Sequence, residues 1–502
     1  MSLSVLISAS EAVPFIKSGG LADVIGVLPR YLRRLGHDVR LVLPRYYGID
    51  KTKFGLKPLA GVLVVPMGGA GDEYCAVYEG SLPDSDIPVY FLEHEGYFGR
   101  SGLYAENNVE YADNDRRFIF LSKGSLELCK MLDFFPDLVH ANDWHTAAIP
   151  LLLNTTYRHD SHVGGAASLL TIHNMQYQGS FPPATMEILG VGWEHFTFLG
   201  VEKDDRVNLL KGGIYNATLL NTVSEGYAAE IQTPAQGWGL EGVLRERNRD
   251  LFGILNGVDY TEWSPESDPY ITANYSAGDL GGKGLCKADV QKEMGLPQRG
   301  DVPLIGMVGR MVTQKGIDVF AEALPRLLEL ELQIVMLGEG EPWAHFYFGG
   351  MAASHRDRLS VCVGYDNGLA HRIEAGADFF LMPSAFEPCG LNQMYSLRYG
   401  TIPIVRGVGG LDDSVENFDE NLLAGTGFKF HDLTAGALFD TVGWALHTWY
   451  NRREGIDRLR QRGMAVRFTW EGAAEKYDRL YKMALKRRSG ASSDTPPRAT
   501  RQ

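Results

Sequence analysis

The sequence predicts an α/β protein made of two doubly wound domains. Three observations support this: short β-branched strands alternate with amphipathic helices, the alternation occurs twice in the 502 residues, and Gly, Pro, Asp and Ser cluster between the two series. A chain of this length is long enough for two or three domains. Ligands of doubly wound domains bind at the carboxyl ends of the strands, so functional residues are expected in the loops that follow them.

The predicted strands fall into two series, with a helix between most neighbours. The first series is Ser4–Ser8, Val39–Leu43, Leu138–Ala141 and Ser168–His173. The second series is Leu304–Val308, Leu332–Leu337, Arg358–Val363, Phe379–Met382 and Ile402–Val405. The predicted helices include Asp23–Leu35 and Asp318–Leu328. We therefore predict one domain over residues 1–257 and another over 258–469. A single large domain with an appendage is the alternative, and it leaves the second series of strand-end motifs unexplained.

Composition and charge exclude several classes of protein. The chain has 48 Lys and Arg against 62 Asp and Glu, a net charge of −14, which disfavours nucleic acid as the main partner. The 5 cysteines show no C-x-x-C spacing and suit a reducing compartment. The amino terminus has no signal-peptide pattern, and no segment approaches the roughly 18 apolar residues of a membrane span. A cytoplasmic protein without membrane partners is predicted.

The loop after the first predicted strand is Lys17-Ser-Gly-Gly-Leu-Ala-Asp, and a helix follows it. Gly19 and Gly20 permit close approach of a ligand, the helix amino terminus offers free N–H groups to an anion, and Lys17 adds a positive charge. The loop therefore suits a phosphate or the charge that develops on a leaving group. A tight turn with a solvated lysine is an equally good interpretation of this motif alone.

Two later strands of the first series end in loops rich in histidine, amide and aromatic side chains. These loops are His140-Ala-Asn-Asp-Trp-His145 and Thr171-Ile-His-Asn-Met-Gln-Tyr-Gln-Gly179. Aromatic rings stack on the CH surfaces of sugars, and the polar side chains bond hydroxyls, so carbohydrate is favoured over lipid or peptide. One such histidine is as easily structural, but two clusters at successive strand ends favour a site.

No catalytic metal is predicted. His140 and His145 are 5 positions apart around a turn, and Glu93-His94-Glu95 lies on a strand whose side chains alternate between faces. The Asp-x-Asp at Asp84-Ser-Asp86 lies between prolines and is typical of a turn.

The second series carries positive charge at one strand end. Arg310 and Lys315 follow the strand Leu304–Val308, where they can meet a pyrophosphate in the neutralising role that Mg²⁺ plays in many enzymes that act on diphosphates. Tyr365 ends another strand, and its ring can stack on a nucleobase, although a core tyrosine is equally compatible.

The most informative stretch runs from Pro383 to Met394, after the strand Phe379–Met382. Glu387 in this stretch can bind two sugar hydroxyls at once, and the N–H groups of the following helix can serve a phosphate. The loop Gly407–Gly410 adds a second place where a ligand can approach the backbone closely. A loop glutamate without function is the alternative, and the concentration of polar residues at this strand end disfavours it.

Together these motifs resemble those of bacterial glycogen synthases and plant starch synthases, which share the two-domain GT-B fold. The likeness spans nearly the whole chain, in family order: Lys17-Ser-Gly-Gly-Leu, His140-Ala-Asn-Asp-Trp-His-Thr, Thr171-Ile-His-Asn, Thr222-Val-Ser, Gly253-Ile-Leu-Asn-Gly-Val-Asp, Gly309-Arg-Met-Val-Thr-Gln-Lys-Gly and Phe386-Glu-Pro-Cys-Gly-Leu-Asn-Gln. The resemblance implies two Rossmann-like domains facing across a deep cleft. It also implies a helix over 470–488 that crosses back to the first domain, and composition predicts a disordered tail over 489–502.

The resemblance implies a retaining glucosyltransferase that moves glucose from ADP-glucose to the non-reducing end of an α-1,4-glucan, without a metal or another cofactor. The resemblance implies that Lys17, Gly19 and Gly20 lie at the donor phosphates and that Arg310 and Lys315 bind the diphosphate. It implies that Asp143 and His173 face the glucosyl unit and the acceptor, and that Glu387 holds the transferring glucose. Tyr365 would lie near adenine, and the remaining donor-side residues would be Asn256, Cys389, Gly390 and Leu391.

The chain departs from the family pattern at Glu225-Gly-Tyr, where Pro-x-Tyr is usual, and at Trp238, where a small polar residue is common. These positions concern acceptor preference rather than the reaction. Tyr395 stands where related transferases carry a second glutamate, as in bacterial synthases of this type.

Three alternatives accompany this interpretation. UDP-glucose remains a possible donor, since purine and uracil both stack on tyrosine. A nucleotide-dependent oxidoreductase would require Gly-x-Gly-x-x-Gly after the first strand, where Lys17-Ser-Gly-Gly stands instead. A non-catalytic glucan-binding protein would be expected to lose the charges of Lys17, Arg310, Lys315 and Glu387, all of which are present. The sequence predicts no oligomeric state.

Overall fold

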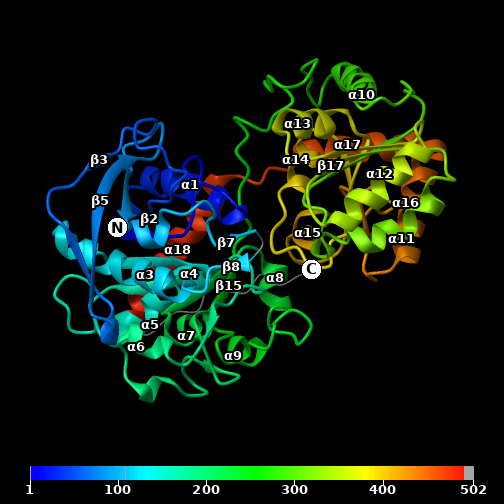
Figure 1. The fold of residues 1–502 in the computed structure, drawn as a ribbon. Coiled ribbons are helices and arrows are strands. Elements are labelled where there is room, and N and C mark those ends of the chain that lie inside the picture. Colours follow the sequence, from blue (N-terminus) through cyan, green and yellow to red (C-terminus); the bar gives the residue numbers. More distant parts are fainter. Residues whose placement is uncertain (1, 108, 491–502) are drawn as a thin grey trace. The chain divides into compact units, whose positions relative to one another are not determined.

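The computed structural model describes residues 2–107 and 109–490. Contacts within the chain divide it into two compact units (Figure 1). Unit 1 comprises the described residues of Met1–Val223, Ala228–Ile254 and Trp470–Gln502, and unit 2 comprises Ser224–Tyr227 and Leu255–Thr469. The tail expected over 489–502 lies outside the described residues from position 491 onward.

The core of unit 1 is a sheet whose central strands run parallel. Among the described residues it has 10 strands, in the order β15-β14-β10-β9-β1-β2-β6-β5-β3, with β4 paired to β5. The parallel strands are β1 (Ser4–Ser8), β2 (Asp38–Pro44), β6 (Pro88–Glu93), β9 (Leu138–Asn142), β10 (Ala167–Ile172), β14 (Leu219–Thr222) and β15 (Leu251–Gly253). The strand order reverses between β1 and β9, and such a switch point provides a ligand crevice at the carboxyl ends of the strands.

An antiparallel extension lies beyond β6, outside the strands that the sequence predicts. It consists of β3 (Lys57–Pro58), β4 (Leu63–Pro66) and β5 (Asp72–Ser81). The extension continues the sheet away from the switch point, so it does not contribute to the crevice.

Helices cover the sheet of unit 1 because each buries one apolar face. Helix α1 (Gly20–Arg34) buries Leu21, Ile25 and Leu28, and each such burial contributes about 1.5–3 kcal/mol. Its last turn carries two arginines, which interact favourably with the carboxyl end of the helix dipole. The other principal helices before the return from unit 2 are α3 (Asn114–Met131), α5 (Ala148–Asn154) and α7 (Leu209–Asn216).

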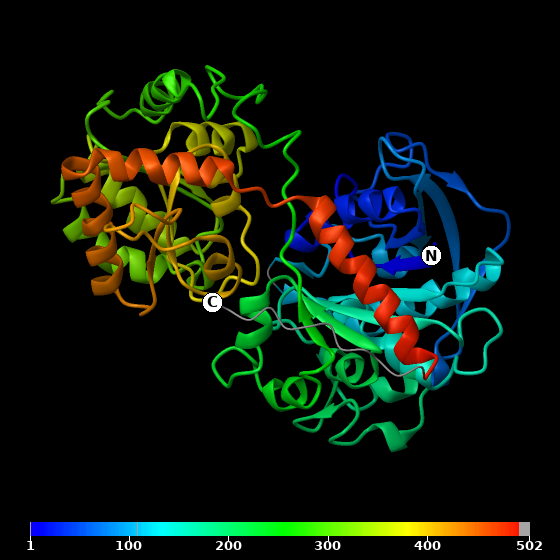
Figure 2. The ribbon, with the colours of Figure 1, turned by 180° about the vertical axis from the view of Figure 1, so that it is seen from behind.

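The last helix of the chain returns to unit 1. Helix α18 (Trp470–Arg488) packs on α1, β9 and β10, and Figure 2 shows it in red along unit 1. The hydroxyl of Tyr481 lies 2.9 Å from Nδ1 of the buried His140, and the hydroxyl of Tyr477 accepts a hydrogen bond from Asn221 at 3.2 Å. The predicted return of the final helix to the first domain is confirmed.

Unit 2 contains a fully parallel sheet. Within the described residues its 6 strands follow the order β18-β17-β16-β19-β20-β21, which is the 3-2-1-4-5-6 order of dinucleotide-binding folds. The strands are β16 (Leu304–Val308), β17 (Gln333–Gly338), β18 (Leu359–Val363), β19 (Phe379–Met382), β20 (Ile402–Arg406) and β21 (Phe428–Phe430). The switch point lies between β16 and β19, whose following loops carry the predicted phosphate- and sugar-binding motifs. The predicted Rossmann-like fold is confirmed in both units.

The helices of unit 2 cover both faces of this sheet. They are α10 (Gly281–Glu293), α11 (Ile317–Leu327), α12 (Pro342–Ser354), α13 (Asn367–Gly376), α14 (Asn392–Arg398), α15 (Gly409–Ser414), α16 (Ala435–Asn451) and α17 (Arg453–Ala465). Asp366 caps α13 and Thr434 caps α16 through their side-chain oxygens, which fixes where these helices begin. None of the helices in the described part of the chain combines the length and the apolar character needed to cross a membrane.

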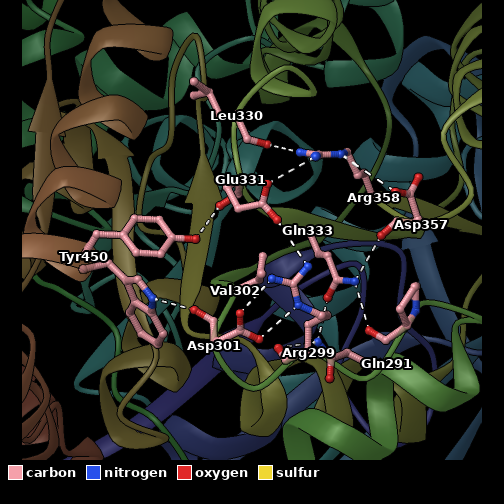
Figure 3. Close-up of polar contacts among 12 residues, drawn as sticks. Gln291, Arg299, Asp301, Val302, Leu330, Glu331, Gln333, Asp357, Arg358 and Tyr450 are labelled. Carbon is pink, nitrogen blue, oxygen red and sulfur yellow. Dashed lines mark hydrogen bonds and ion pairs between the residues drawn. The ribbon is translucent and has the colours of Figure 1, made fainter.

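A polar network fastens the amino-terminal edge of the unit 2 sheet (Figure 3). Arg299 donates to both carboxylate oxygens of Asp301, at 3.0 and 2.7 Å, and to Glu331 at 3.3 Å. Arg358 donates to the other oxygen of Glu331 at 3.3 Å. The pairs between these half-exposed charges each contribute about 0–1 kcal/mol. They lie at the starts of the strands, opposite the edge that carries the predicted site.

Candidate active site

Lys17 lies in the loop between β1 and α1, at the switch point of unit 1. Its Nζ atom pairs with Asp23 of α1 at 2.8 Å, and its side chain is 49% exposed. Burial raises the pKa of Asp23, and the neighbouring Lys17 opposes this shift. An exposed pair of this kind is worth at most about 1 kcal/mol, so a ligand anion can replace Asp23 at little cost.

The same loop is held by Glu11, a residue that the sequence analysis missed. One carboxylate oxygen of Glu11 accepts the N–H groups of Ser18 and Gly19, the latter at 3.2 Å. The other oxygen accepts the Ser18 hydroxyl at 2.9 Å. The N–H groups of Ser18 and Gly19, which precede α1, are therefore already bonded, and the expectation that the amino terminus of the helix serves an anion stays a prediction. The position of Glu11, three residues after the first strand, is the feature of the sequence that could have indicated its role.

Asp143 and His173 are brought together at the ends of β9 and β10. Asp143 begins α4 (Asp143–Thr146) with φ +53°, in the left-handed region that few residues other than glycine adopt. Its Oδ1 atom accepts the N–H of His173 at 2.7 Å and that of Asn174 at 3.4 Å. The His173 ring donates to Asn142 through Nε2 at 3.0 Å. The loop after β9 thus fixes the loop after β10.

Burial sets the charge states of these two residues. It raises the pKa of Asp143 to about 7, against the lowering effect of the N–H groups of His173 and Asn174. It lowers the pKa of His173 to about 3, so the imidazole is neutral at neutral pH. The His173 ring can therefore form a hydrogen bond with a ligand as a neutral imidazole. Asp143 is close to half protonated at neutral pH.

The raised pKa of Asp143 makes a prediction about stability. Between the unfolded value of 3.8 and the folded value of about 7, the folded chain binds more protons at this residue, so its contribution to stability falls as pH rises. Asp143→Asn removes the group whose titration lowers the stability as pH rises. It keeps an oxygen that can accept the N–H of His173. We expect the unfolding free energy of the variant, relative to wild type, to rise with pH by at most about 1.4 kcal/mol per pH unit across this window. Urea unfolding from pH 4.5 to 7.5 checks this, and a difference that stays flat with pH contradicts it.

His140 is a structural residue. It is buried and lies 2.6 Å from the Thr171 hydroxyl and 2.9 Å from that of Tyr481. His140 therefore joins β9, β10 and α18. The residues at this edge of the sheet to which the resemblance gives a role in ligand binding are Asp143 and His173.

Unit 2 contains a cavity at the carboxyl ends of β16 and β19. Its volume is about 170 Å³, and the residues of the sequence prediction that line it are Arg310, Lys315, Glu387, Gly390 and Leu391. Residues from two strand-end loops therefore meet at the switch point, as the topology requires.

Lys315 and Glu387 form an ion pair in this cavity. The Lys315 Nζ atom lies 2.9 Å from one carboxylate oxygen of Glu387 and 2.7 Å from the other. The Ser384 hydroxyl, which the sequence analysis did not single out, donates to Glu387 at 2.9 Å. Arg310 donates to Gln314 at 3.1 Å and is otherwise exposed to the cavity. The cation expected on the diphosphate and the carboxylate expected on the sugar thus form an ion pair with each other.

Two glycines permit this geometry. Gly316 has φ +68°, and a Cβ there would lie 1.9 Å from the carbonyl oxygen of Pro383. Gly390 has φ +69°, and a Cβ there would lie 2.5 Å from Gln393. A larger residue at Gly316 would push the loops after β16 and β19 apart, and one at Gly390 would displace the Gln393 side chain within its own loop.

Asn256 and Cys389 lie together in unit 2. The backbone and side chain of Asn256 hydrogen-bond the Cys389 thiol, and burial raises the pKa of this thiol to about 12. Cys389 is therefore protonated and is not a nucleophile. Within the described structure, the buried Oδ1 atom of Asn256 has no hydrogen-bond partner, which leaves it available to a ligand.

Tyr365 is not among the residues that line the cavity. It is 85% exposed, and its hydroxyl lies 3.4 Å from Asn367. The prediction that it stacks on adenine stays a prediction. Among the described residues no group of three or more His, Cys, Asp and Glu has the arrangement of a metal site.

Comparisons with known proteins agree with this geometry. The chain matches the family model described as starch synthase catalytic domain over residues 4–246 and that of glycosyl transferases group 1 over residues 302–444. It is 65% identical to glycogen synthase 1 of Geobacter metallireducens over 97% of both chains. It is 47% identical to glycogen synthase of Anaeromyxobacter sp. (strain Fw109-5), over 96% of this chain and 99% of that protein.

Solved structures are similar as well. The catalytic domain of starch synthase IV from Arabidopsis thaliana, bound to ADP and acarbose, matches with a TM-score of 0.88 and 32% identity, over 97% of this chain and all of that one. A sucrose-phosphate synthase from Thermosynechococcus elongatus matches with a TM-score of 0.59 at 16% identity, over 96% of this chain and 98% of that one, and shows the shared fold alone.

Proposed function

The chain belongs to the glycogen and starch synthase family of glycosyltransferases, and we propose that its donor is ADP-glucose and that transfer retains the α configuration. The observation that carries the proposal is the unit 2 cavity, where Arg310 and Lys315 offer positive charge to a diphosphate beside Glu387, which can bind sugar hydroxyls. The similar starch synthase IV was solved with ADP and acarbose. The acceptor is the non-reducing end of an α-1,4-glucan. The oxidoreductase and non-catalytic alternatives are set aside by family membership.

The proposed reaction breaks the bond between the glucose C1 atom and the phosphate oxygen of ADP. The 4-hydroxyl oxygen of the glucan bonds to C1 from the same face, and its proton passes to the departing phosphate oxygen. Lys17, Arg310 and Lys315 stabilise the charge that develops on ADP, and positive charge aimed at a leaving group is usually the largest catalytic contribution. Asp143, His173 and Glu387 hold the sugar in its reactive pose.

Donor binding exchanges the partners of the two lysines. In the structure Asp23 pairs with Lys17, and Glu387 pairs with Lys315. The donor diphosphate replaces both carboxylates as the partner of the lysines. Glu387 is then released to accept hydrogen bonds from the glucosyl hydroxyls, so phosphate binding and sugar binding occur together.

The donor assignment is tested by measuring nucleotide release with ADP-glucose and with UDP-glucose, each with glycogen as acceptor. We expect the rate with ADP-glucose to be at least about tenfold higher at equal, subsaturating concentrations, because a pocket shaped for one base leaves polar groups unpaired with the other. An equal or higher rate with UDP-glucose overturns the assignment. The anomeric configuration of the new linkage, read by NMR, tests retention.

We also propose that transfer needs no metal, because Lys17, Arg310 and Lys315 supply the positive charge that a cation would otherwise provide. Assays in excess EDTA are expected to give the same rate as assays with added Mg²⁺. A loss of activity in EDTA that Mg²⁺ restores contradicts this. The predicted cytoplasmic location stays a prediction.

A further inference from the structure

We propose that Glu11 is a positioning residue, which holds the loop from Lys17 to Gly20 in the conformation that presents Lys17 to the donor. The inference rests on the proposed function, in which Lys17 acts on the donor phosphates. Glu11 itself is not assigned a contact with substrate.

The carboxylate of Glu11 is the principal fixed point of this loop. It accepts the backbone N–H of Ser18, the Ser18 hydroxyl at 2.9 Å and the backbone N–H of Gly19 at 3.2 Å. These groups directly follow Lys17, so they determine the direction in which the Lys17 side chain leaves the backbone.

Packing leaves one side of the two glycines of this loop open. A Cβ added to Gly19 or Gly20 would meet nothing within 4 Å, so this part of the backbone is open on the side where a side chain would lie. Gly19 also precedes α1 without a side-chain cap. Two consecutive glycines have large conformational freedom, so a loop that contains them needs hydrogen bonds to stay in one conformation.

Glu11 also connects this loop to the rest of the candidate site. Its second oxygen accepts the Tyr104 hydroxyl at 2.9 Å. The Tyr104 ring packs against His145 of α4 with 4.6 Å between ring centroids, and α4 begins at Asp143. The loops after β1 and β9 are therefore linked through one buried carboxylate.

The burial of Glu11 is unusual because no cation accompanies it. Its side chain is 4% exposed, and within the described part of the chain no Lys, Arg or His nitrogen forms an ion pair with it. A buried carboxylate is costly unless hydrogen bonds satisfy it, and the donors here are the neutral groups of Ser18, Gly19 and Tyr104. Two of these donors belong to the loop that carries Lys17, so the Glu11 carboxylate fixes this loop.

The test compares Glu11→Ala with Glu11→Gln by steady-state kinetics. A glutamine can still accept the two N–H groups through its oxygen and donate to Tyr104 through its nitrogen, so it keeps the loop while removing the charge. We expect Glu11→Ala to lower kcat/KM for ADP-glucose about tenfold with KM for glycogen within about twofold, and Glu11→Gln to stay within about threefold of wild type.

The matched control is Asp160→Ala. Asp160 also lies in unit 1 and accepts two backbone N–H groups of its own loop, from His162 at 2.9 Å and Val163 at 3.2 Å, at the opposite edge of the sheet. This variant is expected to lose thermal stability without a change in KM for ADP-glucose.

A double-mutant cycle shows whether Glu11 acts through Lys17. In a Lys17→Ala background, adding Glu11→Ala is expected to lower kcat/KM by a further factor of less than about two. The reason is that the side chain positioned by Glu11 is already absent. Normal kinetics of Glu11→Ala, equal losses for Gln and Ala, or full additivity with Lys17→Ala would each overturn the inference. Absence of glucosyl transfer by the wild-type enzyme would instead refute the proposed function.

Discussion

Lys315→Ala is expected to lower kcat/KM for ADP-glucose about 100-fold or more, the loss typical of removing one preorganised contact to developing charge. Lys315 is one of two cations at the cavity of unit 2, and its Nζ atom lies 2.7 Å from Glu387. The substitution also removes the ion-pair partner of Glu387. Steady-state rates of ADP release with glycogen as acceptor measure the effect.

The control is Arg299→Ala, which removes another paired cation from unit 2. Arg299 pairs with Asp301 and Glu331 at the opposite edge of the same sheet (Figure 3). Its loss is expected to leave kcat/KM within about twofold, since exposed pairs contribute about 0–1 kcal/mol and do not touch the donor. Near-normal turnover of Lys315→Ala would remove Lys315 from the proposed role.

Glu387→Gln is expected to change two measured quantities in opposite directions. The rate of transfer falls about 100-fold, because the charge-assisted hydrogen bonds to the glucosyl hydroxyls are lost. Affinity for ADP rises about fivefold, because Lys315 no longer has to leave a carboxylate, a gain of roughly 1 kcal/mol. Turnover assays and calorimetric titration with ADP measure the two effects.

General damage to the fold cannot produce this pattern, since it would weaken both turnover and ADP binding. Glu331→Gln serves as the control because Glu331 also bonds two basic side chains, Arg299 and Arg358, away from the cavity. It is expected to alter neither quantity by more than about twofold. Weaker ADP binding by Glu387→Gln would contradict the exchange of partners.

The parallel strands of both units were predictable because buried parallel strands are continuous apolar runs. The prediction agrees with β1, β16 and β19 at both ends, and it places β10 one residue late. Helix α1 begins three residues earlier than predicted, at Gly20, because hydrogen bonds of the loop and not the first acidic residue set its start. The antiparallel extension β3–β5 was missed, since its strands alternate between buried and exposed residues and lack the apolar runs used to find the others.

The candidate site was predictable only in part. Strand-end position indicated Arg310, Lys315 and Glu387, and these residues do meet at one cavity. The pairing of Lys315 with Glu387 was not predictable, because the sequence gives no distance between loops that are 72 positions apart. Ser384 went unnoticed for a different reason, because its contact with Glu387 depends on the shape of one turn.

We propose that Lys17 acts on the donor diphosphate as well as Lys315, and the account depends most on this proposal. Calorimetric titration of wild type, Lys17→Ala and Lys315→Ala with ADP tests it most directly. The account predicts one ADP bound per chain and about tenfold or greater weakening of that single binding event in each variant. An affinity for ADP that Lys17→Ala leaves unchanged while Lys315→Ala lowers it would contradict the claim.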